Sequence, residues 1–387
     1  MIRDQARQSA LLDEVRGFVR GVAMPAEARV AAEDAMPEEL VEQMRRRGYF
    51  GWSIPEEYGG AGLTTEELAL ANIELSQAAV AFRARVGINT GIGSESLIQD
   101  GSTALKRRYL LGLASGALTG ALALTEPEAG SDATALQTTG TRVGNDAYCL
   151  NGHKRYITLA PIADLFTVFA RTDEGSRGRD GITAFVVERG TPGLATSGAT
   201  PKMGQEGAPI GEVFLRDCVV SAEAIVGEPG GGFRTLMKTL NKQRINLAAL
   251  ATGPAIRLLD EAVAHARKRR QFGRMIGEFQ LVQALLADCK VEIEAARALI
   301  LETARKRDRG EDVTMDVSLC KYFATEMCGR VADRVVQVLG GEGYVEGTVE
   351  RFYRDVRAFR IYEGTSQIHQ LNIGKHLMRE PHAMEPT

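Results

Sequence analysis

The sequence lacks the features that mark membrane-spanning, secreted or disulfide-stabilised proteins. No apolar run reaches the roughly 20 residues that a spanning helix needs, and the first ten residues carry charges where a signal peptide would be apolar. The five cysteines form no CxxC pair, which indicates reduced and mostly buried thiols rather than a metal site. We therefore expect a cytoplasmic protein with no bound metal and no membrane contact.

The chain also lacks an excess of charge of either sign. It has 47 Lys and Arg against 50 Asp and Glu, for a formal net charge of −3. A balance of this kind creates no global field that would favour nucleic acid, so we expect no nucleic-acid partner. Its 387 residues, 44% of them hydrophobic, are enough for two or three domains with cores of their own.

Helical periodicity dominates both ends of the sequence. Near the N-terminus, apolar residues recur every three or four positions, which predicts helices at 10–22, 38–47, 65–79 and 104–113. After a glycine-rich linker, longer amphipathic helices are predicted at 233–268, 278–309, 315–339 and 365–378. Helices as long as these pack as a bundle.

The middle of the chain has a different pattern, with short runs rich in Val, Ile, Phe and Thr. Strands are predicted at 148–157, 166–171, 182–188 and 212–215. Asn151-Gly152 is a strong signal for a tight hairpin turn. Neither glycine-rich stretch has the GxGxxG spacing of a dinucleotide-binding fold. We expect an α+β fold with a helical domain at 1–118, a β-barrel-like domain at 119–226 and a four-helix-bundle domain at 227–387.

Glu363 is the strongest candidate for a catalytic residue. It stands between Tyr362 and Gly364, where a carboxylate can be partly desolvated while the glycine lets the backbone bend around a ligand. These are the properties of a tuned general base. Taken alone, Glu-Gly-Thr would more often be a surface turn.

Three further motifs change the interpretation of Glu363. They are Ala-Leu-Thr-Glu-Pro-Glu-Ala-Gly-Ser-Asp-Ala at 123–133, Arg-Arg-Gln-Phe-Gly at 269–273 and Gln-Val-Leu-Gly-Gly-Glu-Gly-Tyr at 337–344. Together with Tyr-Glu-Gly-Thr at 362–365, they make the chain resemble the acyl-CoA dehydrogenase family over nearly its whole length. The resemblance implies that family's three-domain fold, FAD as cofactor, a homotetramer built as a dimer of dimers, and an electron-transferring flavoprotein as electron acceptor.

The resemblance also implies a reaction in fatty acid metabolism. Glu363 would remove the α-proton of an acyl-CoA thioester, and flavin N5 would take the β-hydride, giving the trans-2-enoyl-CoA. The backbone of Glu363 and Gly364 would bind the thioester carbonyl as negative charge develops. Gln243 stands where some family members place their catalytic glutamate, so Glu363 is the only candidate base.

Flavin contacts are implied for residues in five segments. They are Leu124, Thr125, Ser131, Tyr156, Thr158, Arg269, Gln271, Phe272, Gln337, Gly340, Gly341, Thr365 and Gln367. In the family, the segments at 269–273 and 337–344 reach the cofactor of a neighbouring subunit. Tyr156 departs from the usual tryptophan, and Leu159-Ala160 replace the usual Asn-Gly.

Each of these residues also has an ordinary structural interpretation. Thr125 and Ser131 could be turn or capping residues. Tyr156 could be part of a strand core. The basic triplet at 268–270 could be a solvated helix end, and the paired glycines after a long helix could be its C-cap.

Two arginines bear on the substrate. Arg244 is expected to bind the pantetheine or nearby acids, or else to form a buried ion pair in its helix. Arg83 resembles the arginine with which glutaryl-CoA dehydrogenases and related desulfinases pair a terminal anion of the acyl group. It would favour a short anionic substrate, unless it is a surface or interface arginine. The sequence does not select a chain length, or coenzyme A over a carrier-protein thioester.

Two alternatives to the dehydrogenase stay open on the sequence. One is a non-oxidising, desulfinase-like relative that acts on a short anionic acyl-CoA. Those relatives lack the glutamate, so Glu363 argues for oxidation. The other is a flavin-free scaffold, against which the intact Thr125, Ser131, Thr158, Arg269 and Gln367 argue.

Overall fold

The computed structural model describes residues 1–173 and 175–379 of the chain. It divides into two compact units. Of the described residues, one unit comprises 1–22, 65–79 and 244–379, and the other comprises 23–64, 80–173 and 175–243. Among the described residues, no helix is both long and apolar enough to span a bilayer.

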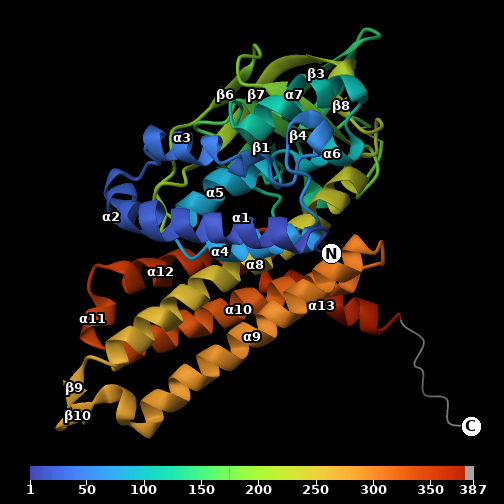
Figure 1. Ribbon diagram of the computed structural model, residues 1–387. Coiled ribbons are helices and arrows are strands. Elements are labelled where there is room, and N and C mark those ends of the chain that lie inside the picture. Colours follow the sequence, from blue (N-terminus) through green and yellow to red (C-terminus); the bar gives the residue numbers. More distant parts are fainter. Residues whose placement is uncertain (174, 380–387) are drawn as a thin grey trace, which may run out of the picture. The chain divides into compact units, whose positions relative to one another are not determined.

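The unit of residues 23–64 and 80–243 is built around an eight-stranded sheet (Figure 1). Its strands are β1 (Gly120–Ala123), β2 (Thr139–Val143), β3 (Ala147–Thr158), β4 (Leu165–Arg171), β5 (Ile182–Glu188), β6 (Leu194–Thr196), β7 (Ile210–Ser221) and β8 (Ile225–Val226). The strand order is β6-β7-β3-β2-β4-β5-β8, and β1 pairs in parallel with β4. All other main pairings are antiparallel, except the single parallel pair between β2 and β4.

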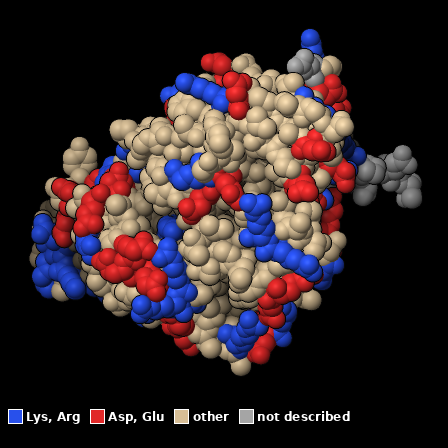
Figure 2. Space-filling view, turned by 90° about the horizontal axis from the view of Figure 1, so that it is seen from above, with Lys and Arg blue, Asp and Glu red and all other residues tan. Residues whose placement is uncertain are grey.

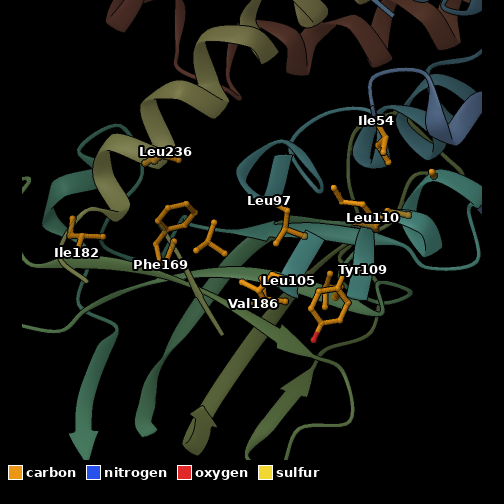
Figure 3. Close-up of a cluster of buried hydrophobic side chains, with 14 of the residues drawn as sticks. Ile54, Leu97, Leu105, Tyr109, Leu110, Phe169, Ile182, Val186 and Leu236 are labelled. Atoms are coloured by element: carbon orange, nitrogen blue, oxygen red, sulfur yellow. The ribbon is translucent and has the colours of Figure 1, made fainter. Parts of the chain in front are cut away.

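The central strands β4 and β5 are buried on both faces because their side chains alternate between two hydrophobic clusters. Leu165 and Phe169 point into one cluster, while Phe166 and Val168 point into the other. Figure 3 shows the first cluster, where the sheet meets helix residues such as Leu110. Sheet and helices therefore share a core that holds the strand ends in place.

The helices of this unit have ordinary local signals at their ends. They are α2 (Met24–Glu33), α3 (Glu38–Arg46), α5 (Val80–Asn89), α6 (Glu95–Asp100), α7 (Thr103–Ser115) and the first part of α8 (Gly232–Ala266). The Ser102 side chain caps α7 by accepting from Leu105 N, and Gly116 ends it with φ 74°. The sequence did not predict α2, α5 or α6.

The predicted hairpin turn at Asn151-Gly152 is wrong, because both residues lie inside β3. The register between β3 and β7 shifts at this point, so the pair forms a bulge. The Asn151 side chain accepts from Asp217 N at 2.8 Å. A Cβ on Gly152 would lie 2.2 Å from Thr138 Oγ1, so glycine is needed for close packing rather than for a turn.

The other unit is a helical bundle. Its helices are α1 (Gln5–Phe18), α4 (Thr65–Leu75), the rest of α8, α9 (Gln280–Asp308), α10 (Thr314–Leu339), α11 (Gly341–Tyr344), α12 (Thr348–Val356) and α13 (Ser366–Leu377). Helix α10 packs against α9, α12 and α13, and α4 packs against α1 and α9 (Figure 1). A short hairpin of β9 (Arg270–Gln271) and β10 (Arg274–Met275) joins α8 to α9.

The surface charges agree with the balanced composition. On the face drawn in Figure 2, Lys and Arg side chains and Asp and Glu side chains lie in small neighbouring groups.

Four of the five free cysteines are buried and Cys149 is half-buried, as the apolar sequence around them predicted.

Candidate active site

Glu363 lies in a short connection between the turn Arg357–Arg360 and α13. Its backbone is in the left-handed region with φ 54°, and Gly364 follows with φ 95°. A non-glycine residue seldom adopts this conformation without tertiary contacts that hold it there. Thr365 ends the connection as the N-cap of α13, with its hydroxyl accepting from Ile368 N at 3.3 Å. Gln367, in the first turn of α13, is exposed.

Two buried basic side chains contact this connection, and a third, Arg244, is buried and interacts electrostatically with Glu363. The Lys321 ammonium donates to the Gly364 carbonyl at 2.7 Å, and His369 Nε2 lies 3.3 Å from the Glu363 carbonyl. Lys321 and His369 are fully buried, and Arg244 is 5% exposed. The segment that carries the candidate base is thus held by side chains from α10 and α13.

Burial sets the protonation of these basic groups. It lowers the pKa of His369 to about 3, together with the charges of Arg244 and Lys321, so the ring is neutral near pH 7. Burial also lowers the pKa of Lys321 to about 8, although the Glu363 charge raises it. The pKa of Arg244 is lowered by burial and raised by Glu363, which indicates that the Glu363 carboxylate and the Arg244 guanidinium interact.

The segment at 124–133 begins where β1 ends. Leu124 and Thr125 are half-buried, and Ser131 is exposed. Arg155 N donates to the Thr125 carbonyl at 2.8 Å, which places Thr125 beside the end of β3. The hydroxyls of Thr125 and Thr158 are therefore carried by neighbouring stretches of backbone.

A buried ion pair holds this segment to the sheet. Lys154, which is fully buried in β3, contacts Glu126 Oε1 at 2.7 Å. Its ammonium also donates to the carbonyls of Leu124 at 3.2 Å and Phe169 at 2.6 Å, so three acceptors face its three protons. We call this arrangement the Lys154–Glu126 clamp. Burial lowers the pKa of Lys154 to about 8, against the raising effect of Glu126.

The end of β3 suits the edge of a flat aromatic cofactor. Tyr156 is 53% exposed and has φ 58°, and Leu159 has φ 60°. Thr158 is half-buried and pairs with Ile210 of β7. Hydroxyl donors from two neighbouring segments beside an exposed aromatic ring form a donor set that fits a flavin.

The other predicted cofactor residues lie at one end of the helical bundle. Arg269 and Gln271 are exposed, and Phe272 at the tip of the β9–β10 hairpin is 93% exposed with φ 51°. Gln337, Gly340 and Gly341 are also exposed, around the end of α10. His265 Nδ1 lies 3.6 Å from Glu342 Oε2, so the two regions are close together. A phenyl ring this exposed is unusual for a surface that only meets water.

Arg83 and Gln243 are both buried within the sheet-containing unit. A Cβ on Gly87 would lie 1.7 Å from Arg83 Nη1, and a Cβ on Gly91 would lie 2.4 Å from Gln243 Oε1. The two side chains therefore occupy space that only glycine leaves on their neighbours. An arginine buried in this way is not the surface residue of the ordinary interpretation.

Sequence reasoning missed Lys154, Glu126, Lys321 and His369. A signal for Lys321 was present, because it occupies an apolar face of its helix, four residues after Val317 and three before Ala324. A lysine at a core position of a strand or helix needs a buried partner. The identity of that partner could not be inferred from spacing.

Three family models match the chain. They are "Acyl-CoA dehydrogenase, N-terminal domain" at residues 5–117, "Acyl-CoA dehydrogenase, middle domain" at 121–218 and "Acyl-CoA dehydrogenase, C-terminal domain" at 230–378. The "3-(aryl)acrylate reductase" of Clostridium sporogenes (strain ATCC 15579) is 40% identical over 366 residues, covering 94% of this chain and 96% of the relative.

Two further similar proteins bear on partner and substrate. The "Caffeyl-CoA reductase-Etf complex subunit CarC" of Acetobacterium woodii is 36% identical, covering 89% of this chain and 90% of the relative. A solved "Structure of the glutaryl-coenzyme A dehydrogenase glutaryl-CoA complex" has a TM-score of 0.92 and 35% identity, covering 98% of this chain and 96% of that one.

Proposed function

Because the chain belongs to the acyl-CoA dehydrogenase family and is a flavin-dependent oxidoreductase, we propose that it oxidises an acyl-CoA thioester to the trans-2-enoyl-CoA. The observation that carries the proposal is the backbone of Glu363. This backbone is left-handed, and buried donors contact the carbonyls of Glu363 and Gly364. Glu363 also stands in the motif from which the family takes its base. A base so constrained suits abstraction of an acidified carbon-bound proton.

Each site residue has a role in the proposal. Glu363 accepts the α-proton, and the backbone around Gly364 orients the thioester. FAD, when bound, supplies the acceptor for the β-hydride. Thr125 and Thr158 hold the flavin ring with Leu124 and Tyr156, and Ser131 holds the pyrophosphate. Arg244, whose pKa the Glu363 charge raises, binds the thioester or its carrier in this proposal.

Thioester-dependent bleaching of the flavin tests the proposal. We expect FAD-loaded protein to lose its flavin absorbance anaerobically with at least one member of a panel of straight-chain, branched, glutaryl and aryl thioesters, since dehydrogenation reduces the flavin. Because the similar proteins include two reductases, the reduced protein is also mixed with the matching enoyl thioesters. A flavoprotein that responds to neither set would contradict the function.

The proposed partners follow from the exposed apolar residues of the bundle. They include Phe272, Leu281, Val291, Tyr344, Leu371, Leu377 and Met378. A second copy that covers them and approaches the hairpin would supply Arg269, Gln271 and Phe272 to the neighbouring flavin, with Gln337, Gly340, Gly341, Thr365 and Gln367. We therefore propose a homotetramer.

We also propose a cytoplasmic location and a role in fatty acid metabolism, with an electron-transferring flavoprotein reoxidising the cofactor, as the name of one relative suggests.

Arg83 supports a finer proposal, that the acyl group is short and ends in an anion. Gly87 leaves room for the guanidinium, so Gly87→Ala should displace it. If Arg83 pairs with the substrate, this variant should lose about 10- to 100-fold in kcat/KM with glutaryl-CoA and much less with butyryl-CoA, since a charged hydrogen bond contributes about 1.5–3 kcal/mol.

Gly17→Ala is the matched control, because Gly17 lies in a helix and a Cβ there meets nothing within 4 Å. Steady-state assays measure, for each variant, the ratio of kcat/KM with glutaryl-CoA to kcat/KM with butyryl-CoA. Equal losses on the two substrates in Gly87→Ala would contradict a substrate anion at Arg83.

Neither alternative from the sequence is favoured. A desulfinase-like relative would lack the glutamate that stands at position 363. A flavin-free scaffold has no use for the cluster of hydroxyl donors at the ends of β1 and β3.

A further inference from the structure

We infer that His369 and Lys321 are positioning residues for the catalytic base, with no direct contact to substrate or cofactor. The inference rests on the proposed function, because it assigns to these two side chains the task of holding Glu363 in its reactive orientation. Neither residue belongs to the motifs from which the function was inferred.

The first observation is the backbone that they hold. Glu363 and Gly364 have consecutive positive φ angles of 54° and 95°. A glutamate leaves the left-handed region readily unless the surrounding structure over-determines it. The direction of the Glu363 side chain depends on this φ, since the Cα–Cβ bond turns with the backbone. Whatever maintains the two angles therefore also aims the carboxylate.

The second observation is that each of the two carbonyls has one buried donor. His369 Nε2 faces the Glu363 carbonyl at 3.3 Å, and the Lys321 ammonium faces the Gly364 carbonyl at 2.7 Å. Both side chains are fully buried, so water does not replace them easily. A rotation of the peptide between Glu363 and Gly364 would break the contact to His369.

The third observation concerns the proton on His369. A carbonyl only accepts, so Nε2 must carry the proton, while Nδ1 has no hydrogen-bond partner among the described residues. The positive charges of Arg244 and Lys321 and the burial of the ring keep it neutral. His369 is therefore a donor of fixed tautomer rather than a titrating base, and it does not compete with Glu363 for the substrate proton.

The packing of the His369 ring against the backbone also explains why position 364 is a glycine. A Cβ at this position would lie 3.0 Å from His369 Nε2. On the other side, Ser366 Oγ donates to Glu326 Oε1 at 2.5 Å, and Arg360 donates to Glu326 Oε2 at 3.2 Å. Lys321 of α10 and His369 of α13 thus contact the connection itself, and Glu326 of α10 contacts the residues that flank it.

The test compares His369→Leu, which removes the donor, with His369→Gln, whose side-chain amide can donate from a similar place. In the FAD-loaded protein, we expect His369→Leu to slow thioester-dependent flavin reduction by about 10- to 100-fold, because small misplacements of a reacting group have effects of this size. Its KM should change little, and His369→Gln should recover most of the rate. His376→Leu, on the same helix, is the matched control.

Amide hydrogen exchange at residues 361–366 is the second measurement, and it needs no turnover. It should be faster in His369→Leu and in Lys321→Met than in the wild-type protein, and close to wild type in His369→Gln. Wild-type rates of reduction and exchange in His369→Leu would overturn the inference, as would a His369→Gln variant as slow as His369→Leu. If the wild-type flavin is neither reduced by an acyl thioester nor reoxidised by an enoyl thioester, the proposed function fails, and exchange alone then decides whether the two residues hold the segment.

Discussion

Replacing Glu363 with glutamine is expected to lower the rate of thioester-dependent flavin reduction by about 10²- to 10⁴-fold, the usual contribution of a general base. The amide has the same shape but cannot accept the α-proton. Gln243, the other position from which a family member could supply a base, already carries an amide and lies against Gly91. The chain therefore offers no second carboxylate from these two positions to rescue the variant.

Rapid mixing under anaerobic conditions, followed at the flavin absorbance, measures this effect. FAD content and thioester binding should stay close to wild type in Glu363→Gln, because the backbone contacts of residue 363 do not involve its carboxylate. Glu223→Gln, at an exposed position in the turn Ala222–Ala224, serves as control. Full activity in Glu363→Gln would remove the central residue of the proposed mechanism.

Replacing Lys154 with methionine should have the largest effect on stability. The variant keeps the length of the side chain but leaves the buried Glu126 carboxylate without its cation. Removing one partner of a buried ion pair usually costs about 3–5 kcal/mol. Because the clamp holds the segment that carries Thr125 and Ser131, the affinity for FAD should fall as well.

Denaturant unfolding and FAD titration test this prediction. Lys290→Met breaks an exposed pair with Glu294 at 2.6 Å, and should change the free energy of unfolding by less than about 0.5 kcal/mol. The double variant Lys154→Met/Glu126→Gln should recover part of the loss, because the unpaired charge is gone. A single variant as stable as wild type, with unchanged FAD affinity, would show that the clamp has neither role.

Periodicity predicted the long helices closely. The segment predicted at 315–339 is α10 at Thr314–Leu339, and the one at 278–309 is α9 at Gln280–Asp308. Their apolar residues repeat over many turns, so a local pattern defines them. Helix α5 was missed because its residues are buried on nearly all sides, which hides the amphipathic signal. Helix α6 spans only Glu95–Asp100, which is too short for the helical period to repeat. The three-domain fold is confirmed by the family models, while the domain boundaries at 118 and 226 stay predictions.

The residues around position 363 pointed to Glu363 as a base, and the family resemblance implied flavin contacts for the hydroxyls of Thr125 and Thr158. These roles stay predictions. Asn151-Gly152 shows where local reasoning failed. The dipeptide favours a tight turn by itself, but long-range pairing of β3 with β7 placed it in a bulge. The free energy by which Asn-Gly favours a tight turn is small compared with the free energy gained by burying two paired strands.

The sequence alone determined the α+β class, the long helices of the bundle and the motif that carries the base, since each is written in contiguous residues. Only the tertiary structure decided the left-handed backbone of Glu363, the contacts of Lys321 and His369 with its two carbonyls, and the pairing of Lys154 with Glu126. The physical reason is that a buried charge or donor needs a partner, and the partner comes from whichever distant segment the packing of the core brings within hydrogen-bonding distance.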